Sequence, residues 1–315
     1  MSKLNFAFLF PGQGSQKIGM LSSVAKQFSE VKTCFEEASN VLGYDLWDLS
    51  QNGSSEKINL TEITQPLMLA AAVSLWRVWL SLGGRKPDYL AGHSLGEFSA
   101  LVCSNVIDFP DAISLVRQRG MFMQSAVPVG EGGMSAIIGL DDQNIVDICA
   151  SFSEKKIVQA VNFNSPGQVV IAGHKSAVFD AGLACKKAGA KRVLPLPVSA
   201  PFHTELMRDA ANKLSTIIKD INFSAPKIPI LHNVNAKIED SPEKIKSLLV
   251  EQTYMPVQWT KSLIHLRDIG IDMTLECGPG KVLSGLSKRT NKLFQTGSLE
   301  LPDDLLSYVS ISNTL

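Results

Sequence analysis

The pentapeptide Gly92-His93-Ser94-Leu95-Gly96 is the stretch of the chain best suited to covalent chemistry. It follows a short apolar run at residues 89–91 and precedes a helical pattern from Glu97 to Asn105. Small residues around a serine allow the sharp strand–turn–helix called a nucleophile elbow, in which the hydroxyl is presented for attack. The alternative is a glycine-bounded turn with a capping serine, but this does not explain why the turn directly follows an apolar strand. We therefore predict that Ser94 is a nucleophile.

A serine hydroxyl needs a neighbouring base, because it is a weak nucleophile at neutral pH. Histidine has a suitable pKa, and the chain contains five histidines. His203 is the best placed, because it follows a proline-containing loop where the chain returns to the main domain. The others adjoin the nucleophile or lie in an inserted segment, a strand and a late helix: His93, His174, His232 and His265. A surface or helix-capping role is the alternative for His203.

No carboxylate between Ser94 and His203 has the spacing expected for the third member of a catalytic triad. The aspartates of that interval are better explained as helix caps or surface groups: Asp108, Asp141, Asp142 and Asp180. A backbone carbonyl can orient a neutral imidazole equally well. The missing acid therefore does not exclude a serine–histidine dyad.

An oxyanion formed at Ser94 needs hydrogen-bond donors that are fixed before the reaction. In a nucleophile elbow the first donor is the backbone N–H of the next residue, here Leu95. For the second we predict the backbone N–H of Gln13, in a glycine-flanked loop after the first apolar strand. This loop could instead be a purely structural turn. A dinucleotide-binding G-x-G-x-x-G fingerprint would need glycine in place of Lys17.

Arg119 belongs to a helical stretch in which its near neighbours are all apolar: Leu115, Val116, Phe122 and Met123. A guanidinium stays charged in such surroundings and needs a carboxylate or several acceptors to offset its desolvation. Two interpretations follow. Either a protein carboxylate pairs with Arg119, or the substrate brings the anion.

The elements that must position these residues alternate between strands and helices, which indicates an α/β fold. The apolar run at residues 5–10 is typical of a buried parallel strand that ends at a ligand-binding loop. Strands are predicted at residues 5–10, 89–91, 134–140, 156–162, 168–172, 192–196, 223–226, 229–234 and 273–276. Helices are predicted at residues 20–42, 65–82, 97–105, 141–153, 175–188, 205–219, 242–250 and 281–289. Two more helices are predicted: one begins near residue 108, and the other ends at residue 268. The chain after Asn291 has no clear pattern.

Residues 134–195 have the order βαββαβ, which is the signature of a ferredoxin-like unit. Turn-prone segments, Gly130–Gly133 and Pro195–Pro201, stand at its two ends. Clefts between domains commonly bind ligands. The predicted domains are a main domain formed by residues 1–129 and 200–315, and a ferredoxin-like insertion at residues 130–199.

Charge and composition argue against several classes of protein. Thirty basic residues balance thirty acidic ones, so no overall charge favours nucleic acid or a membrane surface. The five cysteines are widely spaced without a C-x-x-C pair, which argues against a zinc site and a secreted disulfide framework. The apolar run at residues 67–82 is interrupted by Arg77 and reads as a buried helix. We expect a cytoplasmic protein without a bound metal that binds neither nucleic acid nor membrane.

Five separated motifs together resemble the malonyl-CoA:acyl carrier protein transacylases of bacterial fatty acid synthesis. The motifs are Phe10–Gln16, Gly92–Ala100, Arg117–Gly120, Pro201–His203 and Glu276–Gly280. They occur in order across nearly the whole chain, which makes the resemblance far more specific than the pentapeptide alone. Cys277 is a small departure from the pattern and affects no predicted catalytic group.

The resemblance implies an α/β-hydrolase-like main domain with a ferredoxin-like insertion. It implies Ser94 as the acylated nucleophile, His203 as base and acid, and Arg119 as the partner of the malonyl carboxylate. It also implies that the backbone carbonyl of Gln252 orients His203. Phe202 resembles the residue found before the histidine in malonyl-selective members.

The implied reaction is a ping-pong transfer of malonyl from malonyl-CoA to the phosphopantetheine thiol of holo acyl carrier protein, through a malonyl-serine, for fatty acid biosynthesis. We expect a monomer and no separate cofactor. Two other classes are a hydrolase with the same elbow and a non-catalytic carrier-protein adaptor, although an adaptor would have lost a reactive group. The densest basic stretch could dock an acidic carrier protein or be a solvated helix end: Lys186, Lys187, Lys191 and Arg192.

Overall fold

Two separate β-sheets organise the chain in the computed structural model, which describes residues 5–152, 156–198 and 200–314. The first sheet is parallel and contains β1 (Phe6–Phe10), β2 (Tyr89–Gly92), β7 (Ile230–Leu231), β8 (Met273–Glu276) and β9 (Gln295–Ser298). Its strand order is β7-β2-β1-β8-β9. The second sheet is antiparallel, with β3 (Gly132–Ile138), β4 (Val158–Ser165), β5 (Gln168–His174) and β6 (Arg192–Pro195) in the order β4-β5-β3-β6. The predicted α/β class with a parallel-sheet core is confirmed.

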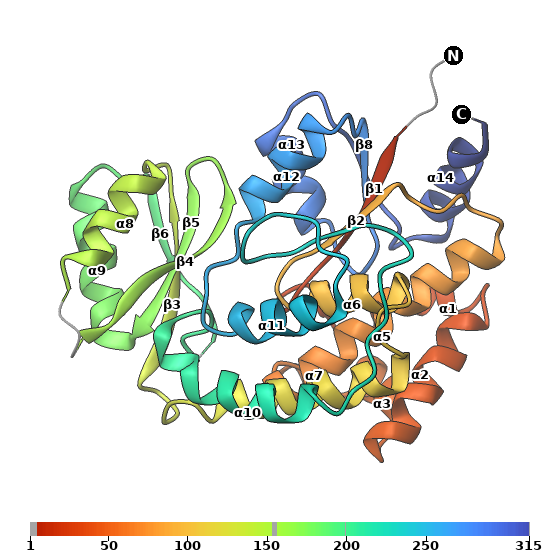
Figure 1. The fold of residues 1–315 in the computed structure, drawn as a ribbon, viewed down its shortest axis with the longest axis horizontal. Coiled ribbons are helices and arrows are strands. Elements are labelled where there is room, and N and C mark those ends of the chain that lie inside the picture. The colour runs from red at the N-terminus through yellow and green to blue at the C-terminus, as the bar shows by residue number, and fades with distance from the viewer. Residues whose placement is uncertain (1–4, 153–155, 199, 315) are drawn as a thin grey trace.

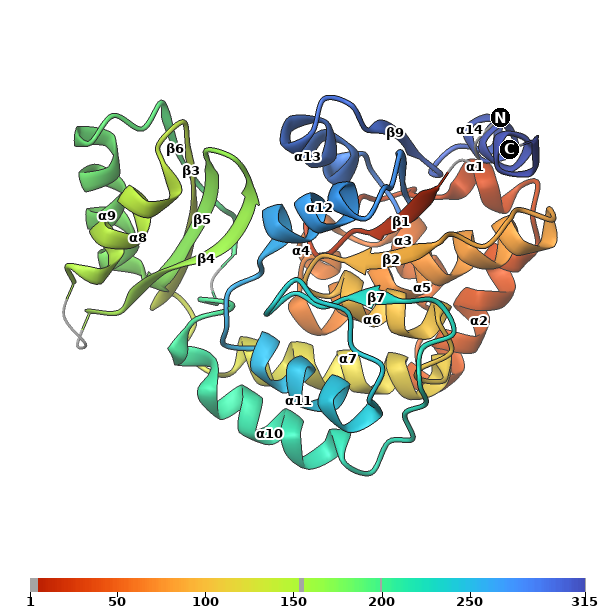
Figure 2. The ribbon, with the colours of Figure 1, turned by 45° about the horizontal axis from the view of Figure 1, so that its top comes forward.

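Strand β1 lies at the centre of the parallel sheet and is buried along its whole length. Because side chains alternate along a strand, its three phenylalanines face one side and its alanine and leucine face the other. The phenylalanine side packs against α2 (Glu30–Leu42), α5 (Thr61–Ser81), α6 (Gly96–Cys103) and α7 (Phe109–Gln124). The other side packs against α12 (Trp259–Asp268) and α13 (Val282–Thr290). Figure 2 shows these two helical layers on either side of β1 and β2.

Helix α5 carries the longest apolar run. Among the described residues it is the one helix whose length and hydropathy would allow it to cross a membrane, but 89% of its apolar window is buried inside the protein. Trp76 and Trp79 pack edge-on against Phe8, with ring centroids 5.8 and 5.0 Å apart. The prediction of a buried helix here is confirmed, and its start at Thr61 lies four residues earlier than expected.

The antiparallel sheet and its two helices, α8 (Asp142–Ala150) and α9 (Lys175–Lys187), have their own apolar core and lie beside the parallel sheet (Figure 1). The element order is βαββαβ, as predicted. Hydrogen bonds join β4 to the rest of the chain: Val257 N donates to Val161 O at 2.8 Å, and Phe163 N donates to Val257 O at 3.0 Å. Ser199, where the predicted insertion ends, and Ser153, where one predicted helix ends, lie outside the described residues.

Several elements of the structure differ from those predicted from the sequence. Residues 223–226 form no strand, and β7 has only two residues; Pro226 and Pro229 cannot donate hydrogen bonds to a sheet. The predicted helix at residues 20–42 is divided into α1 (Ser22–Ala25) and α2. The predicted helix at 205–219 begins as a short 3-10 turn, Glu205–Met207, followed by α10 (Arg208–Ile218). The remaining helix of the core, α11 (Pro242–Gln252), extends two residues further than predicted.

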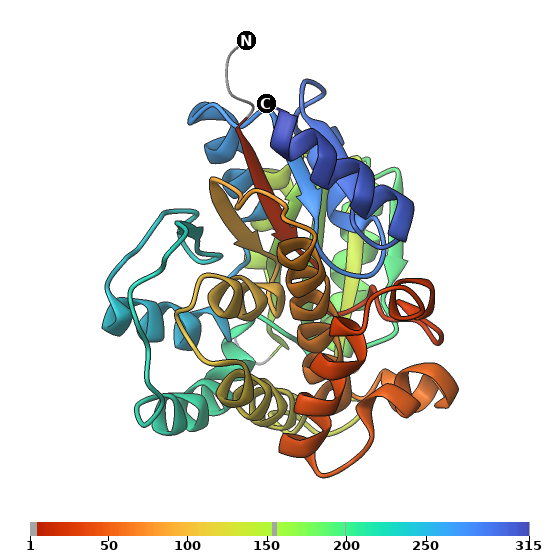
Figure 3. The same cartoon turned by 90° about the vertical axis from the view of Figure 1, so that its right-hand side faces the viewer.

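Four elements had no counterpart in the sequence prediction. They are α3 (Leu46–Asn52), α4 (Ser55–Ile58), β9 and α14 (Pro302–Thr314). The two short helices carry N-cap signals, since the side chains of Asp45 and Ser54 accept hydrogen bonds from the first turn. Helix α14 packs near β9 at the edge of the parallel sheet (Figure 3). Its first residue is a proline, which suits a helix start.

Candidate active site

Ser94 stands in a tight turn between the end of β2 and the start of α6. Its backbone has φ of 51°, in the left-handed region that non-glycine residues rarely adopt. The flanking glycines are sterically required, because a Cβ on Gly96 would overlap the carbonyl of Phe10 and one on Gly92 would overlap the backbone of Gly96. The turn therefore has the geometry of a nucleophile elbow.

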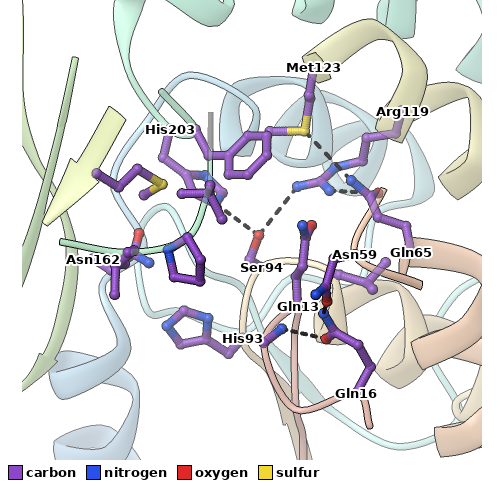
Figure 4. Close-up of a pocket in the computed structure, with 17 residues that line it drawn as sticks. Gln13, Gln16, Asn59, Gln65, His93, Ser94, Arg119, Met123, Asn162 and His203 are labelled. Carbon is purple, nitrogen blue, oxygen red and sulfur yellow. Dashed lines mark hydrogen bonds between the residues drawn. The ribbon is translucent and has the colours of Figure 1, made fainter. Parts of the chain in front are cut away.

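His203 lies against the hydroxyl of Ser94, with Nε2 2.8 Å from Oγ (Figure 4). The other ring nitrogen, Nδ1, lies 2.7 Å from the backbone carbonyl of Gln252. A carbonyl can only accept, so Nδ1 carries the proton and Nε2 accepts the hydrogen bond from Ser94. The structure thus brings together the three groups that the resemblance implied as nucleophile, base and orienting carbonyl.

His203 is buried, with 3% of the residue exposed. Burial lowers its pKa from the usual 6.5 to about 3, with a further lowering by the positive charge of Arg119 and an opposing contribution from the Gln252 carbonyl. The ring is therefore neutral near pH 7. A neutral imidazole that accepts from a serine hydroxyl is the form that a general base requires.

Arg119 lies on α7, and the residue is 2% exposed. Nη1 donates to Gln65 Oε1 at 2.8 Å, and Nη2 donates to Gln252 Oε1 at 2.9 Å and, more weakly, to Ser94 Oγ at 3.4 Å. Burial lowers the pKa of Arg119 to about 10, against an upward contribution from Glu97. Among the described residues no carboxylate forms an ion pair with Arg119, and its Nε has no hydrogen-bond partner. Direct pairing with a described protein carboxylate is therefore not observed.

The backbone N–H groups of Gln13 and Leu95 are not used by other groups of the described chain. Both residues line the same cavity as Ser94. The loop that carries Gln13 packs directly on the segment around Gly278, because a Cβ on Gly278 would overlap the ring of Pro11. The Glu276–Gly280 motif thus supports the Gln13 loop from behind.

A buried polar network behind the elbow was not predicted. Asn233 Oδ1 accepts from Ser94 N at 2.6 Å, and its Nδ2 donates to Gly92 O at 2.6 Å, so one amide spans the turn. Glu97 accepts from Asn233 N at 3.1 Å, from Gln252 Nε2 at 2.8 Å and from His232 Nδ1 at 2.7 Å. A glutamate in the first turn of a largely apolar helix was the sequence signal of this network.

The remaining histidines lie away from Ser94 Oγ. The ring of His93 points to the antiparallel sheet, where Nε2 lies 2.8 Å from Asn164 Oδ1, and it packs edge-on against Trp259. His232 is fully buried beside Glu97. His174 ends β5 and His265 lies on α12. His203 is thus the histidine within hydrogen-bond distance of the nucleophile.

Ser94, His203 and Arg119 open into a cavity of about 500 Å³, a size that suits a small-molecule ligand. Figure 4 shows Ser94 at its centre, between His203 and Arg119. Polar residues line one part and apolar residues from the antiparallel sheet and neighbouring loops line another: Gln13, Gln16, Asn59, Gln65, Met123, Met134, Asn162, Leu196, Val198 and Phe202. Among the described residues no cluster of three or more His, Cys, Asp or Glu is arranged to hold a metal ion.

The basic stretch Lys186–Arg192 lies at the end of α9 and the start of β6. Lys186 Nζ donates to the backbone carbonyl of Lys191 at 2.8 Å. Lys186, Lys187, Lys191 and Arg192 are all exposed. Both interpretations of this stretch, as a docking site or a solvated helix end, stay open.

Comparison with known proteins gives one consistent family. Residues 7–299 match the model of the acyl transferase domain. The chain is 56% identical to a malonyl CoA-acyl carrier protein transacylase of Salmonella typhimurium, over 94% of this chain and 96% of that protein. It is 41% identical to a protein of the same name from Bacillus subtilis, over 97% and 96% of the two chains.

Solved structures agree with the sequence comparison. A malonyl-transacylase in complex with a type II PKS acyl-carrier protein has a TM-score of 0.96 and 51% identity, over 98% of this chain and 99% of that chain. An acyl carrier protein S-malonyltransferase from Vibrio cholerae has a TM-score of 0.94 and 52% identity, over 96% and 99% of the chains. The chain therefore belongs to the acyl transferase domain family and, within it, to the malonyl-CoA:acyl carrier protein transacylases, which are acyltransferases.

Proposed function

We propose that the protein transfers malonyl groups from malonyl-CoA to the phosphopantetheine thiol of holo acyl carrier protein by a ping-pong mechanism, and so supplies extender units for fatty acid biosynthesis. The observation that carries this proposal is the environment of one oxygen. Ser94 Oγ lies 2.8 Å from His203 Nε2 and 3.4 Å from Arg119 Nη2. A nucleophile that has a neutral base on one side and a buried cation on the other suits an acyl group that ends in a carboxylate.

In the first half-reaction, Ser94 Oγ attacks the thioester carbonyl of malonyl-CoA while its proton passes to His203 Nε2. The carbonyl oxygen becomes an oxyanion, which the N–H groups of Gln13 and Leu95 stabilise. The C–S bond then breaks, and the departing sulfur takes the proton back from His203. The products are CoA and malonyl-Ser94.

The second half-reaction uses the same groups in reverse roles. The carrier-protein thiol gives its proton to His203 Nε2, and its sulfur attacks the ester carbonyl of malonyl-Ser94. When the C–O bond breaks, His203 returns the proton to Ser94 Oγ. The carbonyl of Gln252 keeps the Nδ1 proton in place, so Nε2 faces the reacting oxygen in both steps.

Arg119 supplies the selectivity in this proposal. Its planar guanidinium can form two parallel hydrogen bonds with the malonyl carboxylate. An acetyl group would leave the buried cation without an anion, which costs free energy in the transition state. Phe202, on the wall of the same cavity, completes the proposed acyl site.

Finer features belong to the same proposal. The βαββαβ order and the β4-β5-β3-β6 strand order support a ferredoxin-like insertion at residues 130–199, and the elbow supports an α/β-hydrolase-like main domain at 1–129 and 200–315. We propose a cytoplasmic monomer that needs no cofactor and binds no nucleic acid or membrane. The exposed residues Lys186, Lys187, Lys191 and Arg192 are a candidate carrier-protein contact.

Incubation of the purified protein with malonyl-CoA alone tests the mechanism. Transfer predicts a stable malonyl adduct on Ser94 in the intact mass, stoichiometric release of CoA, and discharge of the adduct by holo acyl carrier protein. Continuous release of free malonate without an accumulated adduct would identify a hydrolase instead. The Ser94→Ala variant is the control and should acquire no adduct.

A further inference from the structure

Gln252 contacts Ser94, His203 and Arg119, but the proposed mechanism uses only its backbone carbonyl. Its side chain is fully buried at the end of α11. Oε1 accepts from Arg119 Nη2 at 2.9 Å, while Nε2 donates to Ser94 O at 3.0 Å and to Glu97 Oε2 at 2.8 Å. The backbone carbonyl accepts from His203 Nδ1. The side chain therefore lies between the cation of the cavity and the carboxylate behind it.

The orientation of this amide is determined from both ends. Arg119 can only donate, so the amide atom that faces it is the oxygen. The carboxylate of Glu97 accepts, so the amide atom that faces it is the nitrogen. Glu97 itself is held in place by His232 Nδ1 and Asn233 N. A reversed amide would break the hydrogen bonds at both ends, so the arrangement is fixed without any substrate.

Glu97 is the carboxylate whose charge raises the pKa of Arg119, yet the two residues form no ion pair. Two buried opposite charges attract strongly in a low-dielectric interior, and a direct guanidinium–carboxylate pair would satisfy both. The amide of Gln252 occupies the space between them and bonds to each. As a result, the guanidinium keeps its position at the wall of the cavity.

We infer that the Gln252 side chain is a positioning residue for acyl selection: it separates Arg119 from Glu97 and thereby keeps the guanidinium available to the carboxylate of the substrate. The inference rests on the proposed function, because it names how the proposed malonyl site is kept open. Without this side chain, Arg119 turns towards Glu97 and leaves the cavity. Malonyl transfer then loses its specific partner, while acetyl transfer, which needs no cation, loses less.

The position allows a clean test, because truncation of the side chain leaves the backbone carbonyl that orients His203. We would compare the native enzyme, Gln252→Ala, Glu97→Gln and the double variant, which together form a double-mutant cycle. The measured quantity is the ratio of kcat/KM for malonyl-CoA to kcat/KM for acetyl-CoA, with holo acyl carrier protein as acceptor. We expect Gln252→Ala to lower this ratio by about 10- to 100-fold, the range for loss of a hydrogen bond to a charged group. The double variant should regain part of the ratio, because no carboxylate remains to capture Arg119.

Two further measurements separate positioning from general damage. Thr253→Val is a matched control, because Thr253 is also buried at this helix end and its hydroxyl donates to Leu249 O, at 3.4 Å, away from the groups of the cavity. Its ratio should stay within about twofold of the native value. In the Ser94→Ala background, which cannot be acylated, Gln252→Ala should weaken binding of malonyl-CoA and leave that of acetyl-CoA nearly unchanged by calorimetry.

Equal losses for both acyl groups in Gln252→Ala, or a double variant less selective than Gln252→Ala, would overturn the inference. If Gln252→Ala does not fold, Gln252→Ser provides the same measurements, since its side chain is also too short to reach both charges. Failure of the proposed function would appear separately, as absence of a malonyl adduct on the native enzyme. A native enzyme that forms the adduct while the ratio is insensitive to Gln252 would reject this inference alone.

Discussion

Ser94 Oγ and His203 Nε2 lie 2.8 Å apart, although their residues are 109 positions apart in the chain. The contact forms because the elbow after β2 and the loop before α10 meet at one cavity. It is supported from behind by two side-chain amides, of Asn233 and Gln252, that hold the backbone of Ser94. Four predictions about the catalytic groups, and one about the pH dependence of stability, follow from this arrangement, in addition to the test of Gln252.

The first prediction concerns the pH dependence of acylation. Burial and Arg119 lower the pKa of His203 to about 3, so the base stays neutral well below the usual histidine range. The rate of Ser94 acylation by malonyl-CoA, measured by rapid quench, should therefore stay near its plateau as the pH falls from about 8 to about 5. An acid limb with an apparent pKa near that of an unperturbed histidine would contradict the proposed environment of His203.

The same shift predicts how stability depends on pH. The folded-state pKa of His203 is lower than the unfolded value, so the unfolded chain binds more protons below about pH 6.5 and stability declines as the pH falls from there. The lowered pKa of His93, caused mainly by burial, acts in the same direction. His203→Gln should therefore lose less stability than the native protein over this range. Thermal unfolding at a series of pH values measures the difference, and parallel curves would argue against it.

The second prediction concerns Arg119→Ala. Removing the guanidinium should lower kcat/KM for malonyl-CoA by about 30-fold or more, as for loss of one partner of a buried charge pair. Acetyl transfer should be partly retained, so the preference for malonyl disappears. Arg117→Ala is the matched control, since Arg117 lies on the same helix and bonds to Leu42 O instead. Equal losses for the two acyl groups in Arg119→Ala would refute the selective role.

The third prediction concerns Asn233, which spans the elbow from Ser94 N to Gly92 O. Asn233→Ala leaves both backbone groups without these partners and should destabilise the fold by about 2 to 4 kcal/mol. The saturating rate of acylation should fall because the serine is no longer held at its left-handed φ. Binding of malonyl-CoA, measured by calorimetry in the Ser94→Ala background, should be unchanged. A variant that binds weakly but acylates at the native saturating rate would show that Asn233 serves the substrate site instead.

The fourth prediction concerns Gly278, which packs directly on Pro11. A Cβ at this position must displace the loop that presents the Gln13 N–H, and loss of one oxyanion donor slows such reactions by about 100- to 1000-fold. Gly278→Ala should therefore slow malonyl and acetyl transfer to the same extent. Gly285→Ala is the control, because a Cβ there meets only the end of the Arg289 side chain at 3.7 Å. A selective loss of malonyl transfer in Gly278→Ala would place the defect at Arg119 instead of at the oxyanion donors.

The central strands were predictable because their environment is uniform. Strand β1 is buried on both faces, so it appears in the sequence as an unbroken apolar run. Strand β8 is also buried along its whole length, although it contains Thr274 and Glu276, and its predicted bounds match those of the structure. β7 was overestimated because the predicted range included Pro229 and residues 232–234, whereas Ile230 and Leu231 pair with β2 and the chain turns from residue 233. Strand β9 was missed because its four residues, Gln-Thr-Gly-Ser, resemble a loop, whereas α14 was missed although it buries apolar residues such as Leu305 and Val309.

The candidate site also contains residues that were predictable from the sequence and residues that were not. Ser94, Arg119 and His203 each have a local signal: a glycine-bounded turn, apolar helical neighbours and a proline-containing loop. The partners of Glu97 have none, because Asn233 and His232 lie more than a hundred residues away and only tertiary packing buries them against this carboxylate. The side chain of Gln252 was missed for the same reason. Local patterns identify groups that react, whereas groups that hold them become visible only after the chain has folded.

The hydrogen-bonded contact between β4 and Val257 has a consequence for the approach of the two substrates. Val257 bonds to β4 through both its N–H and its carbonyl, and Thr260 Oγ1 donates to Phe163 O at 2.9 Å, so three hydrogen bonds join the antiparallel sheet to this segment. In the proposed reaction, the CoA thioester and then the carrier-protein thiol therefore approach Ser94 by way of the same cavity, one after the other.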